Sequence, residues 1–259
     1  MITGGDKASY AANKVSNTVV LDGITTANSL AAGKAINVSA NRAGKVNTYT
    51  LGGGNVGATG DGVEAESISN GNSAITIDGS NSAFTAPSLN LISYNAPQAS
   101  AKAWSEADSV LVVQISHAKS QINLGSSLNI ADNNTFAADE AVFRADIGDA
   151  LLTTNKATTR GENVGGGAIS PNGATATAVD DITIDIGKEN YKTDAATGTA
   201  LTNLTIAGIN AVTQAADIDL LVVGATTAVA NNKAEATQTN TITTNVKFGG
   251  KVASLAVLT

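Results

Sequence analysis

The chain has 259 residues, no cysteine, one histidine, one tryptophan, 14% charged residues and a formal net charge of −7. Without cysteine, a disulfide framework and a thiolate metal site are both excluded. Because phosphate contacts need a basic face and Lys plus Arg number only 15, the composition also argues against nucleic-acid binding.

Targeting signals are absent from the sequence. The longest apolar run, around residues 220–223, is far shorter than the roughly 20 residues of a membrane-spanning helix. The first ten residues, MITGGDKASY, lack the basic and apolar regions of a secretory signal. We expect a chain that stays in the cell until assembly or leaves without an N-terminal signal; a mature chain with an added Met is a third option.

Many short strands are predicted, because Thr, Val and Ile alternate with polar residues between turn residues. Segments 75–79 and 182–187 each place isoleucines on one face. Continuous apolar runs at 110–113 and 220–223 predict central strands covered on both faces. Further strands are expected at 15–22, 34–38, 45–51, 89–94, 110–115, 121–124, 128–130, 204–209 and 218–223.

The C-terminal segments 241–248 and 251–258 predict a β-hairpin, because Gly249 and Gly250 between them can both adopt positive φ. Phe136, Phe143 and Ile147 recur at near-helical spacing and predict a helix over 136–152, and a shorter helix is expected over 99–108. The fold class expected from these patterns is mainly β, with antiparallel sandwich-like or barrel-like sheets and one or two short helices.

Composition divides the chain into two expected domains. Residues 161–173 are rich in glycine and predict a linker between a β-rich domain at 1–160 and a second at 174–259. Residues 52–62 predict a long exposed loop, and no repeat of fixed period is visible.

Residues suited to catalysis are few. His117 is the only imidazole, and no Gly-x-Ser-x-Gly turn presents a nucleophile to it. Acidic pairs such as Asp180 with Asp181 could serve a glycosidase, but aromatic platforms for sugar rings are scarce. We therefore expect no enzyme activity and no cofactor.

Calcium is the one metal that the oxygen-rich turns could hold. The candidate ligands are Asp132, Asn134 and Asp139 in one segment and Asp61 in another. Neither segment has the full spacing of a calcium loop.

The segment at residues 181–212, DITIDIGKENYKTDAATGTALTNLTIAGINAV, resembles the insertion motif of flagellins and of some phage structural proteins. In that motif two strands precede a helix that ends in Ile-Asn-Ala; this chain departs from it at residues 204–208, which are strand-like. The composition of the whole chain, rich in Ala, Thr, Asn and Gly, resembles that of bacteriophage virion proteins and of surface-layer or adhesin subunits that lack a signal sequence.

The function expected from the sequence is that of a structural protein in a multi-copy assembly. The first expectation is a virion component, such as a capsid, decoration or tail protein, whose partners are copies of itself and neighbouring structural proteins. The alternative is an exported surface-layer, filament or adhesin subunit at the cell surface, and a carbohydrate-active enzyme comes third.

Overall fold

The computed structural model describes most of the chain. The described residues are 2–3, 7–22, 30–54, 58–79, 82–108, 111–148, 154–164, 167–169, 171–187, 201–223, 227–229, 231–247 and 252–258.

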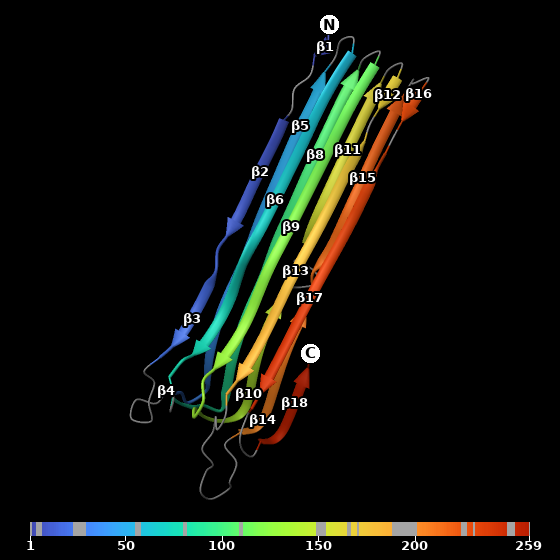
Figure 1. Ribbon diagram of the computed structural model, residues 1–259. Helices are drawn as coiled ribbons and strands as arrows, with labels where there is room; N and C mark the ends of the chain where they lie inside the picture. The colour runs from blue at the N-terminus through green and yellow to red at the C-terminus, as the bar shows by residue number, and fades with distance from the viewer. Residues whose placement is uncertain are drawn as a thin grey trace, which may run out of the picture.

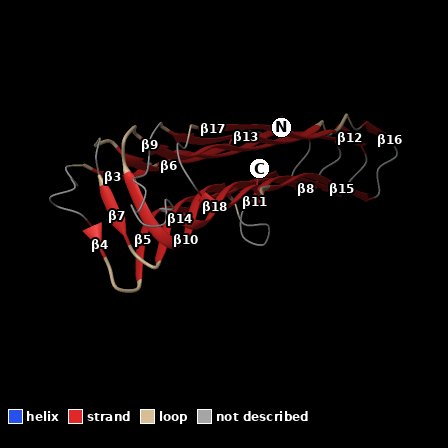
Figure 2. Ribbon diagram, turned by 90° about the horizontal axis from the view of Figure 1, so that it is seen from below, coloured by secondary structure: helices blue, strands red, loops and turns tan. Residues whose placement is uncertain are grey.

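Two nine-stranded sheets lie face to face as two long layers (Figures 1 and 2). Sheet I consists of β1 (Ile2–Thr3), β2 (Lys7–Lys14), β3 (Asn17–Leu21), β6 (Ala58–Ile77), β9 (Leu111–Ile130), β12 (Gly167–Ile169), β13 (Asn172–Ile186), β16 (Thr227–Val229) and β17 (Lys233–Val246). Sheet II consists of β4 (Leu30–Ala31), β5 (Ala35–Gly54), β7 (Ala83–Thr85), β8 (Ser88–Asp108), β10 (Thr135–Ile147), β11 (Thr154–Val164), β14 (Leu201–Asn210), β15 (Thr213–Val223) and β18 (Val252–Leu258).

The chain alternates between the sheets, and each new strand pairs in parallel with the strand one coil earlier. In sheet I, Ala58 lies beside Leu111, Ser116 beside Asn172 and Gly173 beside Lys233, so successive strands are 53, 56 and 60 residues apart in sequence. The fold is therefore a two-sheet parallel β-solenoid. The prediction of mainly β structure is confirmed, but the antiparallel arrangement was wrong, because every strand pair is parallel.

Inward side chains stack from coil to coil and form the core. The predicted inward positions Ile75 and Ile77 are fully buried, and Ile77 lies beside Ile130, which in turn lies beside Ile186. This half of the solenoid holds the large side chains, including three phenylalanines. The other half is filled mainly by alanines such as Ala65, Ala101 and Ala176, so its two layers are separated by short side chains.

The predicted C-terminal hairpin was wrong. Strand β17 belongs to sheet I and pairs with β13, whereas β18 belongs to sheet II and pairs with β14. The two strands therefore lie in different layers, and Gly249 and Gly250 lie outside the described residues.

The two predicted helices were also wrong, since the described residues form no helix. Residues 99–108 belong to β8, with alanines on its inner face, and residues 135–147 form β10. A bulge explains the helix-like spacing of Phe136 and Phe143: Asp139 and Glu140 are both exposed, and both their N–H groups donate to the Pro87 carbonyl, at 3.1 and 3.0 Å. The bulge moves the buried positions from even to odd residue numbers.

Several other expected segments differ from the structure. The predicted loop at 52–62 contains the end of β5 and the start of β6, with residues 55–57 outside the described part. The run 220–223 is not covered on both faces, because Leu221 is 44% exposed. Residues 161–173 contain the end of β11 in sheet II, all of β12 and the first two residues of β13, and β12 and β13 both pair with β9 in sheet I. Within the resemblance at 181–212, residues 201–210 form a strand.

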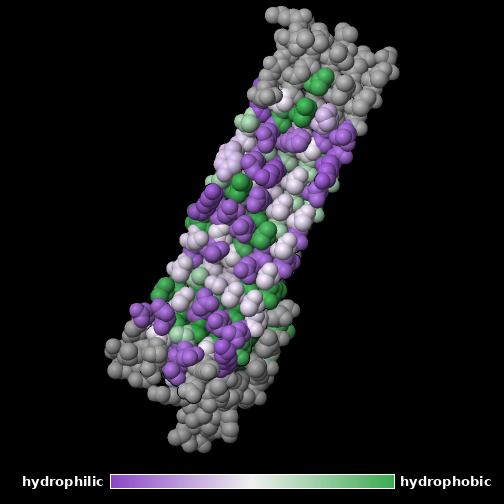
Figure 3. Space-filling model, in the orientation of Figure 1, coloured by the Kyte–Doolittle hydropathy of each residue, from purple (hydrophilic) through white to green (hydrophobic). Residues whose placement is uncertain are grey.

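The outer faces carry exposed polar residues, and further polar residues, among them Arg42, Asn95 and Asp180, are buried between the sheets. The outer face of sheet I is mainly hydrophilic, with scattered apolar residues (Figure 3). Because the described part of the chain contains no helix, it contains none that is long and apolar enough to cross a membrane.

Candidate functional site

A cleft of about 740 Å³ opens on the outer face of sheet II, over the alanine-filled half of the solenoid. Three neighbouring strands build it, because outward residues of β5, β8 and β11 lie side by side in the parallel register. Its outward lining residues are Lys45, Asn47, Tyr49, Gln98, Ser100, Lys102, Trp104, Thr154, Lys156, Thr158 and Arg160.

An aromatic corner closes one end of this cleft. The rings of Tyr49 and Trp104 meet edge to face, with centroids 6.4 Å apart and planes at 86°. The Arg160 guanidinium lies over the indole of Trp104, 4.3 Å from the ring centroid, as in a cation–π pair. Tyr49 is 51% exposed, so one of its surfaces remains open to a ligand. The other ring pairs among the described residues lie in the core.

Four cations line the cleft, but only two are neutralised by neighbours. Lys156 pairs with Asp217 at 2.8 Å, and Arg160 pairs with Glu162 at 2.9 Å and with Asp219 at 3.8 Å. Within the described part of the chain, Lys45 and Lys102 form no ion pair. The side of the cleft formed by β5 and β8 is therefore positively charged.

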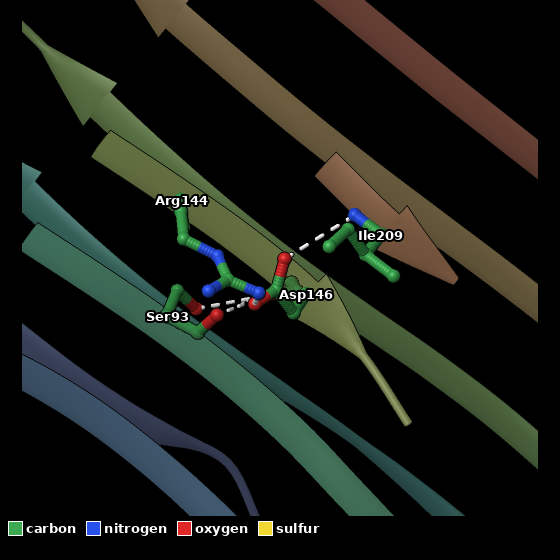
Figure 4. Close-up of polar contacts among 5 residues, drawn as sticks. Ser93, Arg144, Asp146 and Ile209 are labelled. Carbon is green, nitrogen blue, oxygen red and sulfur yellow. Dashed lines mark hydrogen bonds and ion pairs between the residues drawn. The ribbon is translucent and has the colours of Figure 1, made fainter. Parts of the chain in front are cut away.

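A second polar cluster surrounds Asp146, near the end of β10 (Figure 4). The Arg144 guanidinium lies 2.6 Å from one carboxylate oxygen, and the backbone N–H of Ile209 donates to the other at 3.2 Å. Burial nevertheless raises the pKa of Asp146, and these two contacts oppose the rise. Each carboxylate oxygen has a protein partner, so this cluster fastens β10 to β14 and leaves no oxygen open for a ligand.

A third polar group, Asp180, lies inside the sandwich. Its side chain accepts hydrogen bonds from Asn210 and Gln238, both at 3.1 Å, and no cation pairs with it among the described residues. Burial raises the pKa of Asp180 and outweighs the two hydrogen bonds. Asp181, the other member of the sequence-predicted acidic pair, points to the opposite face, so the two carboxylates do not form a catalytic pair.

The candidate calcium ligands do not gather in one place. Asn134 is buried and its side chain is used in a turn, where Oδ1 accepts from the Ser82 N–H at 2.9 Å and Nδ2 donates to the Ala131 carbonyl at 2.8 Å. Asp132 and Asp139 are exposed nearby. Asp61 lies far from this segment. It is 16 residues before Ile77 in β6, and Ile77 pairs with Ile130, which lies just before Asp132; the separation along the strand is therefore about 50 Å. No cluster of three or more potential metal-binding side chains occurs among the described residues.

His117 lies on the outer face of β9, exposed, beside a small hollow of about 290 Å³ that it shares with Lys7 and Glu64. The cleft on sheet II was missed from the sequence, because its residues are 53 to 56 positions apart: Tyr49 lies beside Lys102, and Trp104 lies beside Arg160. Only the parallel register brings them together.

Comparisons with known proteins give no relative. No protein-family model matches the chain, no curated protein matches it, and no solved structure matches it.

Proposed function

We propose that this protein is a structural component of a multi-copy assembly, a virion protein such as a capsid, decoration or tail protein, that binds copies of itself and neighbouring structural proteins. The observation that carries this proposal is the sheet edge at strand β17, which no described strand covers. A parallel sheet that ends in an unpaired strand offers a row of backbone groups to the next strand.

Strand β17 forms that edge. It pairs with β13 on one side, and no described strand lies on its other side. All of residues 233–244 are exposed, including Ile242 on the inner face, which is 40% exposed. An inner-face isoleucine open to water is a position that a further strand and a further coil would cover.

The opposite end of the solenoid has its own edge strands, which run in the same direction as β17 and carry different residues. There β2 and β3 pair only with β6, and β5 pairs only with β8. Tyr10 and Val20 on this edge are 59% and 56% exposed. Because the two ends differ and the strands are parallel, a second copy can continue both sheets head to tail, and such a contact generates an open stack of subunits.

The same geometry supports the alternative assembly, an exported surface-layer, filament or adhesin subunit, which differs in where the stack is anchored. A carbohydrate-cleaving enzyme has less support. Such enzymes need two carboxyl groups flanking the scissile bond, and the described lining of the cleft on sheet II includes no carboxylate.

The test combines electron microscopy of the native source with sedimentation of the purified chain. We expect subunits in virions, and concentration-dependent stacking of the purified protein. Ile242→Lys should abolish stacking, because the inserted ammonium would be buried at the contact. Thr243→Lys is the matched control, since Thr243 is exposed on the outer face of the same strand, and it should stack normally.

A strictly monomeric protein at physiological salt, absent from virion and cell-envelope fractions, would overturn the proposal. Equal loss of stacking in both lysine variants would show that added charge, not the edge, is responsible.

A further inference from the structure

We propose that the cleft on the outer face of sheet II binds an acidic sugar chain, one whose residues carry carboxylate or sulfate groups. Strand β5 is an edge strand, but the cleft is distinct from the edge contact: its lining side chains point outward from the face of sheet II, whereas a second copy would pair with the backbone of β5.

The aromatic corner supplies the surface on which a sugar ring packs. Tyr49 and Trp104 stand nearly perpendicular, at 86°, so a ring lying against one of them meets the edge of the other. Aromatic faces are apolar and carry negative partial charge, which suits the C–H groups that cover one face of a sugar ring. The chain has nine aromatic residues, one of them tryptophan, and two of the nine, the exposed Tyr49 and the half-buried Trp104, form this corner.

The free cations supply the preference for an acidic sugar. Lys45 on β5 and Lys102 on β8 are exposed, and neither has an ion-pair partner among the described residues. The two lysines are four register positions apart, so a carboxylate or sulfate placed against either of them would form charge-assisted hydrogen bonds, which are the stronger kind. Because the net charge of the chain is −7, a polyanion is repelled by most of the surface, so binding would be confined to this positive region.

Uncharged polar groups complete the cleft. Asn47, Ser100 and Thr158 line it with amide and hydroxyl groups that can donate to and accept from sugar hydroxyls. The lining of β8 runs from Gln98 to Trp104, which is about 20 Å of strand. A groove of that length accommodates several linked sugars better than one small ligand.

The residues that line the cleft favour binding over cleavage, and they favour a sugar chain over a nucleic acid. Among the described residues no carboxylate lines the cleft, so we expect a bound chain to be held without hydrolysis. Single-stranded nucleic acid would also stack on the rings, but it carries a phosphate at every residue and needs a longer basic track than two unpaired lysines.

The single tryptophan makes the test direct, because the intrinsic indole fluorescence comes from Trp104 alone. The purified protein is titrated with short oligogalacturonates and hyaluronan oligosaccharides, with neutral maltooligosaccharides of matched length, and with a single-stranded oligonucleotide. We expect a saturable fluorescence change with at least one acidic series, little change with the neutral series, and weaker binding as salt is raised.

Variants locate the site. Lys102→Met should lower the affinity for the acidic chain about tenfold, and Tyr49→Ala should lower it by a similar factor. The matched controls are Lys34→Met and Tyr10→Ala, which change exposed residues elsewhere and should bind normally. Circular dichroism checks that each variant is folded.

Three outcomes would overturn the proposal: no saturable change with any acidic chain at millimolar concentration, equal affinity for neutral chains, or tighter binding of the oligonucleotide. Affinity unchanged in both cleft variants would also overturn it, because binding would then lie elsewhere.

Discussion

Large side chains are concentrated in one small region of the interior, which makes single residues there decisive. Phe84 stacks on Phe136 with centroids 5.2 Å apart, and Phe136 meets Phe143 edge to face at 5.3 Å; all three are fully buried. Phe136 therefore contacts both of the other rings.

We predict that Phe136→Ala lowers the free energy of unfolding by about 3–5 kcal/mol, the usual cost of removing a buried phenyl ring and leaving a cavity. Urea denaturation followed by circular dichroism measures the change. Tyr10→Ala, at an exposed edge position, is the control and should change it by less than about 0.5 kcal/mol. A loss below about 1 kcal/mol for Phe136→Ala would contradict this packing.

Asp180 makes the stability depend on pH. Its folded pKa is raised by burial, so this group's contribution to stability is fully present below its unfolded pKa of about 3.9 and is lost as pH rises through the folded value. We predict that Asp180→Asn raises Tm at pH 7 relative to the parent chain by about 2 °C or more, and by less at pH 3.

Asp181→Asn is the control for Asp180→Asn, because Asp181 is the exposed neighbour on the same strand and its replacement should change Tm little at pH 7. If Asp180→Asn lowers Tm equally at pH 7 and pH 3, the hydrogen bonds to Asn210 and Gln238 outweigh the burial of the charge.

At the level of strands, the central and edge positions of a sheet differ in how many backbone N–H groups are bonded. Strand β9 lies between β6 and β13, so each of its N–H groups faces a neighbour. Strand β17 has a neighbour only in β13, so alternate N–H groups face away from the sheet.

We predict that Gln121→Pro in β9 costs at least about 2 kcal/mol, because proline removes a ladder hydrogen bond and clashes within a central strand. The comparison is with Thr239→Pro and Asn240→Pro in β17, one of which should cost clearly less. Gln121→Thr keeps the N–H and serves as the control. Similar costs at all three prolines would mean that β17 is covered on both edges.

Strand positions could be predicted from the sequence, but their partners could not. Alternation predicted that Ile75 and Ile77 point inward, and both are buried. Turn residues between two strands are found both in hairpins and where the chain crosses to the opposite sheet. The sequence next to each turn therefore did not indicate that the strands pair in parallel. The bulge at Asp139 and Glu140 placed Phe136 and Phe143 seven residues apart on one face, which mimics a helix.

The repeat of one coil after another could not be detected from the sequence either. Equivalent inward positions in successive coils need side chains of suitable size but not the same residue: Val63 lies beside Ser116, and Ser116 lies beside Asn172. The spacing also varies from 51 to 63 residues, so no fixed period is visible. The cleft depends on that spacing, and its residues could not be associated before the register was known.

For the whole molecule, the separation between paired strands controls how fast the chain can fold. Each long strand pairs with one 51 to 63 residues away in a chain of 259, which gives a relative contact order of about 0.2. Closing each coil costs chain entropy before its hydrogen bonds form.

We predict that refolding from urea is slow, because almost all strand pairs join distant parts of the chain. The main phase should last seconds or longer at 25 °C. Stopped-flow circular dichroism at 218 nm measures it. Because the chain has three prolines, a double-mixing experiment with a short unfolding delay separates prolyl isomerisation from coil closure. A main phase in the microsecond to millisecond range would contradict stacking of distant strands, because only local contacts form that quickly.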